Sequence, residues 1–244
     1  MITYILPCAG SGTRLGLPYP KELHRILPGK SLIDFSLEHI RVKPELTEKV
    51  VVVVSPGKES VAEYVRGSVV STVAIETAYF NKNYKEWPGS IKSAEEYFGD
   101  MNVALLPDSI LMPFEEESLG GQFSQAFESG ADVVFAFKEE KRPEYLRSLG
   151  ALYVDGGRVQ RFCDKPNLDD AVQYNAYWAA FGFRKSAGVA LLDLMGRSVS
   201  REAVDLGELN LQVLAFPIKD YTDLGTWPAV SRFLSSPLIA RLSE

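Results

Sequence analysis

Residues 5–23, ILPCAGSGTRLGLPYPKEL, join an apolar strand to a glycine-rich loop that carries two cations. Gly10 and Gly12 follow the strand directly, so backbone N–H groups of the loop can turn toward an anion without a Cβ in the way. Arg14 offers a planar fork for phosphate oxygens, and Lys21 offers a point charge seven residues later. The stretch therefore predicts a β-to-α turn that binds phosphate.

Neither of the two common phosphate loops is present in this stretch. The dinucleotide fingerprint G-x-G-x-x-G fails because Leu15 stands where the third glycine belongs, and the Gly-Lys-Ser/Thr of a Walker A loop is absent. A glycine-rich turn with two solvated basic residues is the alternative interpretation. The loop by itself does not decide between the two.

Strand and helix signals alternate along the first half of the chain. Continuous β-branched runs at 2–8 and 49–55 are typical of strands buried on both faces of a parallel sheet. Between them, Ser31 can cap a helix with Asp34 three residues later. The same alternation predicts helices at 58–66, 88–98 and 115–129, and strands at 71–78, 101–109 and 131–137.

The second half has a different pattern. GALYVDGGRVQRFCDKP, residues 150–166, has the Asp-Gly-Gly turn of an antiparallel hairpin, and QYNAYWAAFGF, residues 173–183, predicts a further strand. A strand near 209–216 and a short terminal helix follow. The sequence therefore predicts an α/β fold with a mixed, mostly parallel sheet.

Composition limits the classes of protein to consider. The chain has 244 residues, of which 46% are hydrophobic, and a formal net charge of −6, which argues against a nucleic-acid partner. The apolar runs are too short for a membrane span, no secretory signal precedes the first strand, and the two cysteines lie far apart. We expect a cytoplasmic protein with one domain over 1–244 and no membrane partner; the oligomeric state stays open, a homo-oligomer included.

Two carboxylates fall where ligands of open α/β sheets bind. LLPDSI places Asp108 at the carboxyl end of a buried strand, the edge from which the glycine-rich loop also projects. YTDLGTW supplies Asp223 just before a Gly-Thr turn. Two carboxylates and phosphate oxygens are how proteins usually hold Mg²⁺. Asp108 and Asp223 are therefore the candidate metal ligands, although each alone is more often a cap or turn residue.

These motifs together resemble the sugar nucleotidyltransferases, or nucleoside-diphosphate-sugar pyrophosphorylases. The resemblance rests on LPCAGSGTRLG with Pro-Lys-Glu at 20–22, LLPDSI, DKP at 164–166 and TDLGTW, in family order over nearly the whole chain. It implies a Rossmann-like three-layer sandwich of the GT-A type. It also implies transfer of a nucleoside monophosphate from a nucleoside triphosphate to a phosphorylated acceptor, most often a sugar 1-phosphate, with release of pyrophosphate and with Mg²⁺ as cofactor.

The resemblance also implies roles for particular residues. Arg14, Lys21 and Lys165 would be catalytic, with Lys165 on the attacking phosphate. The nucleotide would contact Ala9, Gly10, Gly12, Thr13 and Gly89, and the sugar would contact Gly150, Asp164 and Asn175. An ionised acceptor phosphate needs no general base, so His24 and His39 are expected to be structural. Trp87 and Trp178 are expected in the core.

Three departures from the family pattern leave the acceptor open. Pro107 replaces the usual glycine before the metal aspartate, Asp164 replaces the usual glutamate, and the spacing from Arg14 to Lys21 is short. The short spacing resembles cytidylyltransferases that act on a non-sugar phosphate or phosphonate. A non-catalytic nucleotide-binding module is the third hypothesis, and retention of Asp108, Asp223 and Lys165 argues against it.

Overall fold

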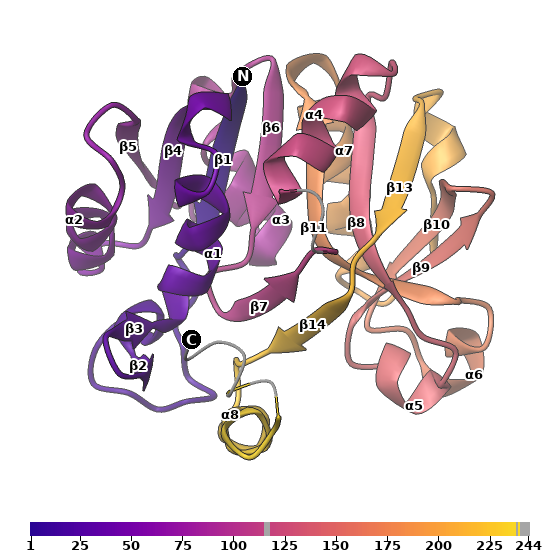
Figure 1. Cartoon of the computed structure of the whole chain (residues 1–244). Coiled ribbons are helices and arrows are strands. Elements are labelled where there is room, and N and C mark those ends of the chain that lie inside the picture. The colour runs from indigo at the N-terminus through magenta and orange to yellow at the C-terminus, as the bar shows by residue number, and fades with distance from the viewer. Residues whose placement is uncertain (115–117, 238, 240–244) are drawn as a thin grey trace.

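A computed structural model describes residues 1–114, 118–237 and 239. Its centre is a ten-stranded mixed sheet with helices on both faces (Figure 1). Along the sheet the strands run β12 (Val204–Asp205), β10 (Arg158–Asp164), β13 (Val213–Pro217), β8 (Val133–Glu139), β11 (Ala176–Arg184), β6 (Met101–Leu105), β1 (Ile2–Pro7), β4 (Thr47–Val54) and β5 (Ala74–Tyr79). A further strand, β9 (Gly150–Asp155), pairs with β10 and β11.

The first half of the sheet is parallel, as predicted. β5, β4, β1 and β6 pair side by side in one direction. Every residue from Val50 to Val54 is fully buried, which is why this run is apolar without alternation. The carboxyl ends of β1 and β6 consequently lie at one edge, and the glycine-rich loop and Asp108 follow them there.

The second half is mixed because β11 runs against both of its neighbours. β11 is antiparallel to β6 on one side and to β8 on the other, while β8 and β13 pair in parallel. The hairpin predicted over 150–166 is confirmed as β9 and β10, with Gly156 and Gly157 both at positive φ in its turn.

Helices cover the two faces of the sheet in separate groups. α1 (Leu32–Arg41), α2 (Glu59–Ser68) and α4 (Leu119–Glu128) pack on one face, and α3 (Glu86–Lys92) and α7 (Lys185–Ser198) pack on the other. The predicted cap of α1 is present, since the side chains of Ser31 and Asp34 each accept from the other residue's backbone N–H. Three layers result, as expected. Residues 115–117 of the helix predicted at 115–129 lie outside the described part of the chain.

Several boundaries differ from the sequence-based expectation. The helix expected over 88–98 ends at Lys92 and is followed by η3 (Glu95–Tyr97), because the Ser93 hydroxyl donates to the Gly89 carbonyl, 2.8 Å away, and competes with the helical backbone. The strand expected over 101–109 breaks at Pro107, which has no N–H to pair. α7 has no counterpart among the predicted helices.

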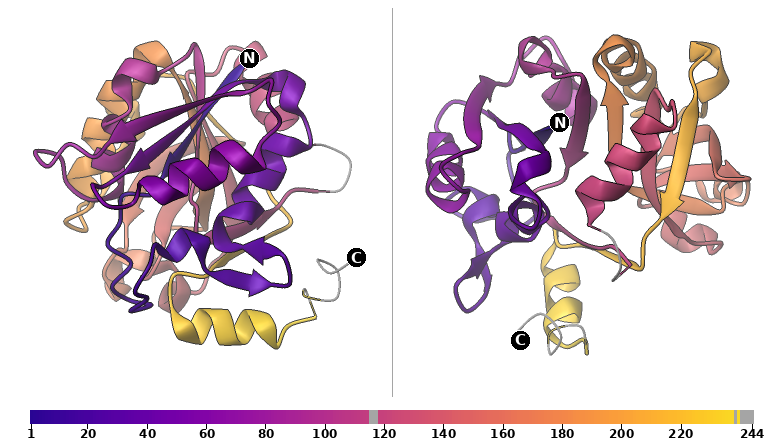
Figure 2. Two further views of the ribbon diagram at one scale, coloured as in Figure 1. Left: turned by 90° about the vertical axis from the view of Figure 1, so that its left-hand side faces the viewer. Right: turned by 45° about the horizontal axis from the view of Figure 1, so that its top comes forward.

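Two small sheets, also unpredicted, extend beyond the carboxyl edge of the central sheet. β7 (Ser109–Met112) pairs with β14 (Asp220–Asp223), and β2 (Arg25–Leu27) pairs with β3 (Lys30–Ser31). α8 (Trp227–Leu234) lies beside the β2–β3 hairpin (Figure 2), and Ile26, Val230 and Phe233 share an apolar cluster there.

The remaining elements are η1 (Lys21–Leu23), η2 (Pro44–Leu46), α5 (Pro143–Leu146), α6 (Leu168–Ala171) and η4 (Leu206–Leu209). Within the described residues, no helix has the length and apolar character needed to cross a bilayer.

Candidate active site

A cavity of about 670 Å³ opens at the carboxyl edge of the parallel strands. Its wall is formed by the glycine-rich loop, the segment after β6, the end of β14, the start of α3 and the β9–β10 hairpin. Nine of the residues singled out by the sequence line it: Ala9, Gly10, Arg14, Lys21, Asp108, Gly150, Asp164, Lys165 and Asp223. The fold therefore brings together residues from both ends of the chain.

Backbone pairing places the two aspartates side by side. In the β7–β14 ladder Asp223 stands opposite Ser109, and the Leu224 N–H donates to the Asp108 carbonyl across 2.8 Å. Gly225 lies where their side chains converge. A Cβ at Gly225 would lie 2.9 Å from an Asp223 carboxylate oxygen and 3.2 Å from an Asp108 carboxylate oxygen. Both carboxylates are thus close enough to share one cation directly or through its water shell.

The absence of a side chain at Gly225 also leaves space for Arg14. Its guanidinium Nη2 lies 2.8 Å from the position that a Cβ on Gly225 would occupy. A side chain at 225 would therefore displace Arg14 or one of the carboxylates. Gly225 is needed here for close approach rather than for an unusual backbone conformation.

Lys21 neutralises one of the two carboxylates. Its ammonium donates to Asp108 Oδ2, and both side chains are largely buried, each 13% exposed. Burial lowers the pKa of Lys21, but the charge and hydrogen bond of Asp108 outweigh burial and raise it above its ordinary value. Lys21 is therefore fully charged at neutral pH.

Asp223 is the less compensated carboxylate of the pair. Burial is the largest effect that raises its pKa, and the neighbouring charge of Asp108 raises it further. The Gly225 N–H, Arg14 and Lys21 lower the pKa, but by less. The Gly225 N–H donates to Asp223 Oδ1 across 2.6 Å. The Lys21 ammonium contacts Asp108, and the Arg14 guanidinium approaches both carboxylates over Gly225, so neighbouring cations offset part of the repulsion between the two. Among the described residues no three Asp, Glu, His or Cys side chains converge, so a metal held here would take further ligands from substrate or water.

The glycine-rich loop is fixed by an ion pair that sequence reasoning missed. Glu22 is fully buried beneath the loop, and the Lys58 ammonium lies 2.9 Å from its carboxylate. Lys58 Nζ also donates to the carbonyl of Gly10, 2.9 Å away, and to that of Cys8. One lysine from the start of α2 thus ties the loop to the fold. Glu22 stands next to the predicted Lys21, but nothing local in the sequence indicates that its partner lies 36 residues away.

The far end of the cavity carries the Asp164–Lys165 pair. Lys165 has a positive φ of 53°, which is uncommon for a residue with a side chain, and its ammonium lies 3.0 Å from Asp164 Oδ2. About half of the Lys165 side chain is exposed, whereas Asp164 is buried. Lys165 therefore presents a partly exposed positive charge to the cavity, and Asp164 holds it in place.

Four of the predicted site residues lie outside the cavity wall. Gly12 and Thr13 are in the loop but behind the lining residues, and Gly12, at a φ of 67°, packs along the Lys21 side chain. Gly89 is required by packing, because a Cβ there would lie 2.6 Å from Tyr84 Cβ. The Asn175 side chain both donates to and accepts from the Val154 backbone, so it fixes β9 instead of facing a ligand.

The two tryptophans expected in the core also line the cavity. Their ring centroids are 4.9 Å apart, and Trp178 is 6% exposed. The Trp178 indole nitrogen packs over Gly150, where a Cβ would lie only 1.8 Å from it. The indole N–H groups of Trp87 and Trp178 are buried with no hydrogen-bond partner. Gly150 is therefore needed to accommodate Trp178, and the cavity wall at this end is aromatic.

Neither histidine lines the cavity formed by the described residues. His39 is half-buried, and the loss of solvation lowers its pKa to about 4, so it is neutral at physiological pH. His24 lies on the other side of the loop, where its ring meets Trp227 edge-on. Both histidines are structural, as expected.

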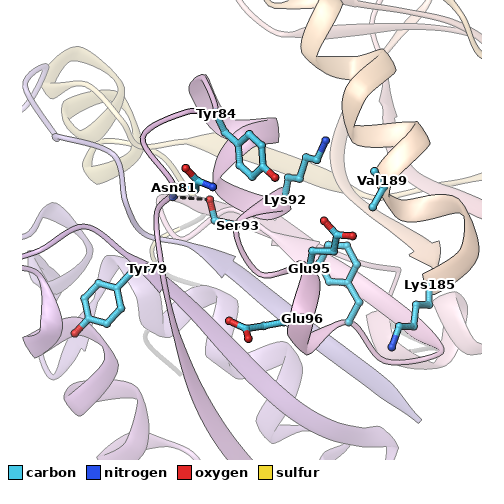
Figure 3. Close-up of a pocket in the computed structure, with 10 residues that line it drawn as sticks. Tyr79, Asn81, Tyr84, Lys92, Ser93, Glu95, Glu96, Lys185 and Val189 are labelled. Atoms are coloured by element: carbon cyan, nitrogen blue, oxygen red, sulfur yellow. Dashed lines mark hydrogen bonds between the residues drawn. The ribbon is translucent and has the colours of Figure 1, made fainter.

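A second cavity, on the α3–α7 side, has a different character (Figure 3). Its lining combines Lys92 and Lys185 with Glu95 and Glu96. The Lys92 ammonium lies 2.5 Å from the Asp193 carboxylate. The Ser93 hydroxyl donates to the Gly89 carbonyl and accepts from the Asn81 N–H. The first cavity, with its adjacent carboxylates and convergent cations, is therefore the candidate active site.

Known proteins resemble the chain in both sequence and fold. The profile of the family described as nucleotidyl transferase matches residues 4–233. The bifunctional protein GlmU of Parvibaculum lavamentivorans is 25% identical over 172 residues, which are 70% of this chain and 36% of that protein. The chain thus spans little more than a third of the length of this relative.

Two solved structures have the same fold. A UDP-glucose pyrophosphorylase from Acinetobacter baumanii superposes with a TM-score of 0.74 at 17% identity, covering 99% of this chain and 100% of that chain. A putative glucose-1-phosphate thymidylyltransferase from Bacillus anthracis gives a TM-score of 0.74 at 12% identity, covering 95% of this chain and 93% of that chain. At these identities the likeness shows the fold alone.

Replacing the loop anchor tests how the glycine-rich loop is held. Lys58→Met should lower the free energy of unfolding by about 3 kcal/mol, because it leaves the buried Glu22 carboxylate without a counter-charge. Lys43→Met is the control, since its pair with Glu45 is exposed and should contribute less than about 1 kcal/mol. Urea denaturation of both variants measures the difference. Equal losses would mean that Lys58 does not anchor the loop.

The raised pKa of Asp223 predicts that removing its charge stabilises the ligand-free protein. Burial and Asp108 disfavour the ionised form of Asp223 in the folded state, so the contribution of Asp223 to stability should become more favourable as pH falls from about 8 through its raised pKa. Asp223→Asn retains an acceptor for the Gly225 N–H and should melt at a higher temperature than wild type at about pH 8. Thermal melts across this pH range measure the effect, with Asp220→Asn on the same strand as control. A lower melting temperature for Asp223→Asn alone would contradict the electrostatic argument.

Proposed function

Because the chain belongs to the nucleotidyl transferase family, we propose that it transfers a nucleoside monophosphate from a nucleoside triphosphate to a sugar 1-phosphate and releases pyrophosphate. One observation carries this proposal: Asp108, Asp223 and Arg14 converge on Gly225 in the cavity that Lys21 also lines. Convergent cations suit a polyphosphate, and adjacent carboxylates suit the metal that accompanies one. We propose that residues 1–244 act as one such domain.

Mg²⁺ is the proposed cofactor, and Asp108 and Asp223 are the residues that would hold it. The fit follows from their convergence beside Gly225 and from the electrostatic cost that each imposes on the other. When bound, Mg²⁺ would neutralise charge on the triphosphate and on the departing pyrophosphate.

Lys21 and Arg14 would bind the triphosphate from the side of the glycine-rich loop. The Lys21 ammonium is held by Asp108, and triphosphate oxygens offer it a competing partner. Arg14 can donate two parallel hydrogen bonds to phosphate oxygens, which fixes their orientation as well as their charge. Gly10, which lines the cavity, leaves the backbone accessible to the same oxygens.

Lys165 would hold the attacking phosphate at the opposite end. A phosphomonoester has a second pKa of about 6, so its oxygen is ionised at neutral pH and needs no general base. The absence of both histidines from the lining of the described cavity agrees with this chemistry. The protein's own contribution is then to position two phosphates and to stabilise the charge that develops between them.

A non-sugar phosphate or phosphonate is the second candidate acceptor. The short spacing between Arg14 and Lys21 favours it. A non-catalytic nucleotide-binding module is the least supported hypothesis, since it would not need both carboxylates. We place the reaction in the cytoplasm, in keeping with the two free cysteines, Cys8 and Cys163.

Pyrophosphate release tests the proposal directly. We expect Mg²⁺-dependent release from one nucleoside triphosphate in a panel of all bases, combined with sugar 1-phosphates, polyol phosphates and phosphonates. Asp108→Asn and Asp223→Asn should each lower the rate by about 100-fold or more, because charge stabilisation in the transition state is lost. Asp220→Asn, on the same strand but outside the cavity wall, should stay near wild type. Full Mg²⁺-dependent activity in either site variant would refute the two-aspartate site.

The acceptor end can be tested separately. Lys165→Ala should raise the KM for the acceptor by about tenfold or more through loss of a charge-assisted hydrogen bond, while the KM for the triphosphate stays nearly constant. Lys141→Ala, an exposed lysine outside the cavity wall, is the control. Steady-state kinetics with each substrate varied in turn distinguish the two parameters. An unchanged acceptor KM would remove Lys165 from the site.

A further inference from the structure

One hydrogen bond joins the glycine-rich loop to the C-terminal helix. The Trp227 indole N–H, at the first residue of α8, donates to the Leu15 carbonyl across 2.9 Å, although 212 residues separate the two in sequence. Trp227 is nevertheless 46% exposed. The apolar contacts of α8 come instead from Val230 and Phe233, which are buried. The hydrogen bond of the indole N–H therefore explains the position of Trp227 better than burial of its ring does.

The Leu15 end of this bond belongs to the segment that carries Arg14. Leu15 is buried, and its N–H closes a turn by donating to the Gly12 carbonyl across 3.1 Å. Fixing the Leu15 carbonyl therefore fixes the turn from Gly12 to Leu15, in which Arg14 is the third residue.

The Trp227 end belongs to the turn that carries Asp223. Only Leu224, Gly225 and Thr226 separate Asp223 from Trp227. Each is held: the Leu224 N–H donates to the Asp108 carbonyl, the Gly225 N–H donates to Asp223, and the Thr226 hydroxyl caps α8. A bond from Trp227 to Leu15 consequently fixes Arg14 relative to both carboxylates.

A second contact extends this attachment to Lys21. The Trp227 ring meets His24 edge-on, with centroids 5.4 Å apart, and His24 Nδ1 is 2.8 Å from the Tyr19 hydroxyl. Tyr19 and His24 flank Lys21 in sequence. The loop segment from Arg14 to Lys21 is therefore attached to Trp227 at both of its ends.

We propose that Trp227 is a positioning residue, which keeps the cations of the Arg14–Lys21 segment in register with Asp108 and Asp223. The inference rests on the proposed function, because it assigns those cations to the triphosphate. Trp227 does not line the cavity, so it acts through Leu15 and His24 rather than on the substrate. Its loss should weaken binding of the triphosphate and leave the acceptor end unaffected.

The test removes the N–H and keeps an aromatic side chain. Trp227→Phe and a variant with benzothienylalanine at 227, in which sulfur replaces the N–H, should raise the KM for the triphosphate about fivefold, the value of one hydrogen bond. The acceptor KM should change less than about twofold. Phe233→Leu is the matched control on α8: it should lower the melting temperature without changing the triphosphate KM.

A double-mutant cycle and hydrogen exchange separate positioning from a general structural role. In an Arg14→Ala background the effect of Trp227→Phe should become smaller, because one of the two cations that Trp227 positions is gone. Amide exchange at Leu15 and Gly16 should be faster in Trp227→Phe than in wild type, a readout that needs no activity.

If wild type releases no pyrophosphate, the proposed function fails, while hydrogen exchange still decides the role of Trp227. Unchanged exchange, an undiminished effect without Arg14, or an equal KM rise in Phe233→Leu would each overturn the inference.

Discussion

Two carboxylates lie side by side in the wall of the candidate active site, and the cations around them offset their mutual repulsion. The β7–β14 ladder places Asp223 beside Asp108, so neither can move away without breaking backbone hydrogen bonds. Burial makes the cost larger, since ionised groups in a low dielectric repel more strongly. Lys21 offsets part of the charge through its bond to Asp108, and Arg14 approaches the same point over Gly225. A divalent cation that binds both carboxylates would reduce their mutual repulsion further.

The fold supplies the rigidity that this arrangement requires. The parallel strands end at one edge of the sheet, so the glycine-rich loop after β1 and Asp108 after β6 lie close together there. The loop itself contains little regular structure and is fixed from outside, by Lys58 and Glu22 on one side and by Trp227 on the other. Both attachments come from elements distant in sequence. The irregular part of the site is thus held by helices α2 and α8.

Local patterns in the sequence predicted much of this structure. The valine run of β4, the Ser31 cap of α1 and the Asp-Gly-Gly turn of the β9–β10 hairpin each depend on neighbouring residues, and each is confirmed. What depends on contacts between distant segments was not predictable: the β7–β14 pairing, the Glu22–Lys58 ion pair and the Trp227 bond to Leu15. The ligand contacts expected of Asn175 and Gly89 stay predictions: Asn175 bonds to the Val154 backbone, Gly89 packs against Tyr84, and neither residue lines the cavity.

Anomalous diffraction from crystals grown with Mn²⁺ and a non-hydrolysable nucleoside triphosphate tests the central claim most directly. Mn²⁺ has the oxygen preference of Mg²⁺ and an anomalous signal that locates it independently of the phosphates. The account predicts a peak between the carboxylates of Asp108 and Asp223, with triphosphate oxygens completing its coordination and Lys21 moved from Asp108 to the phosphates. A metal bound to the triphosphate alone, with Lys21 still on Asp108 and neither carboxylate near the ion, would contradict it.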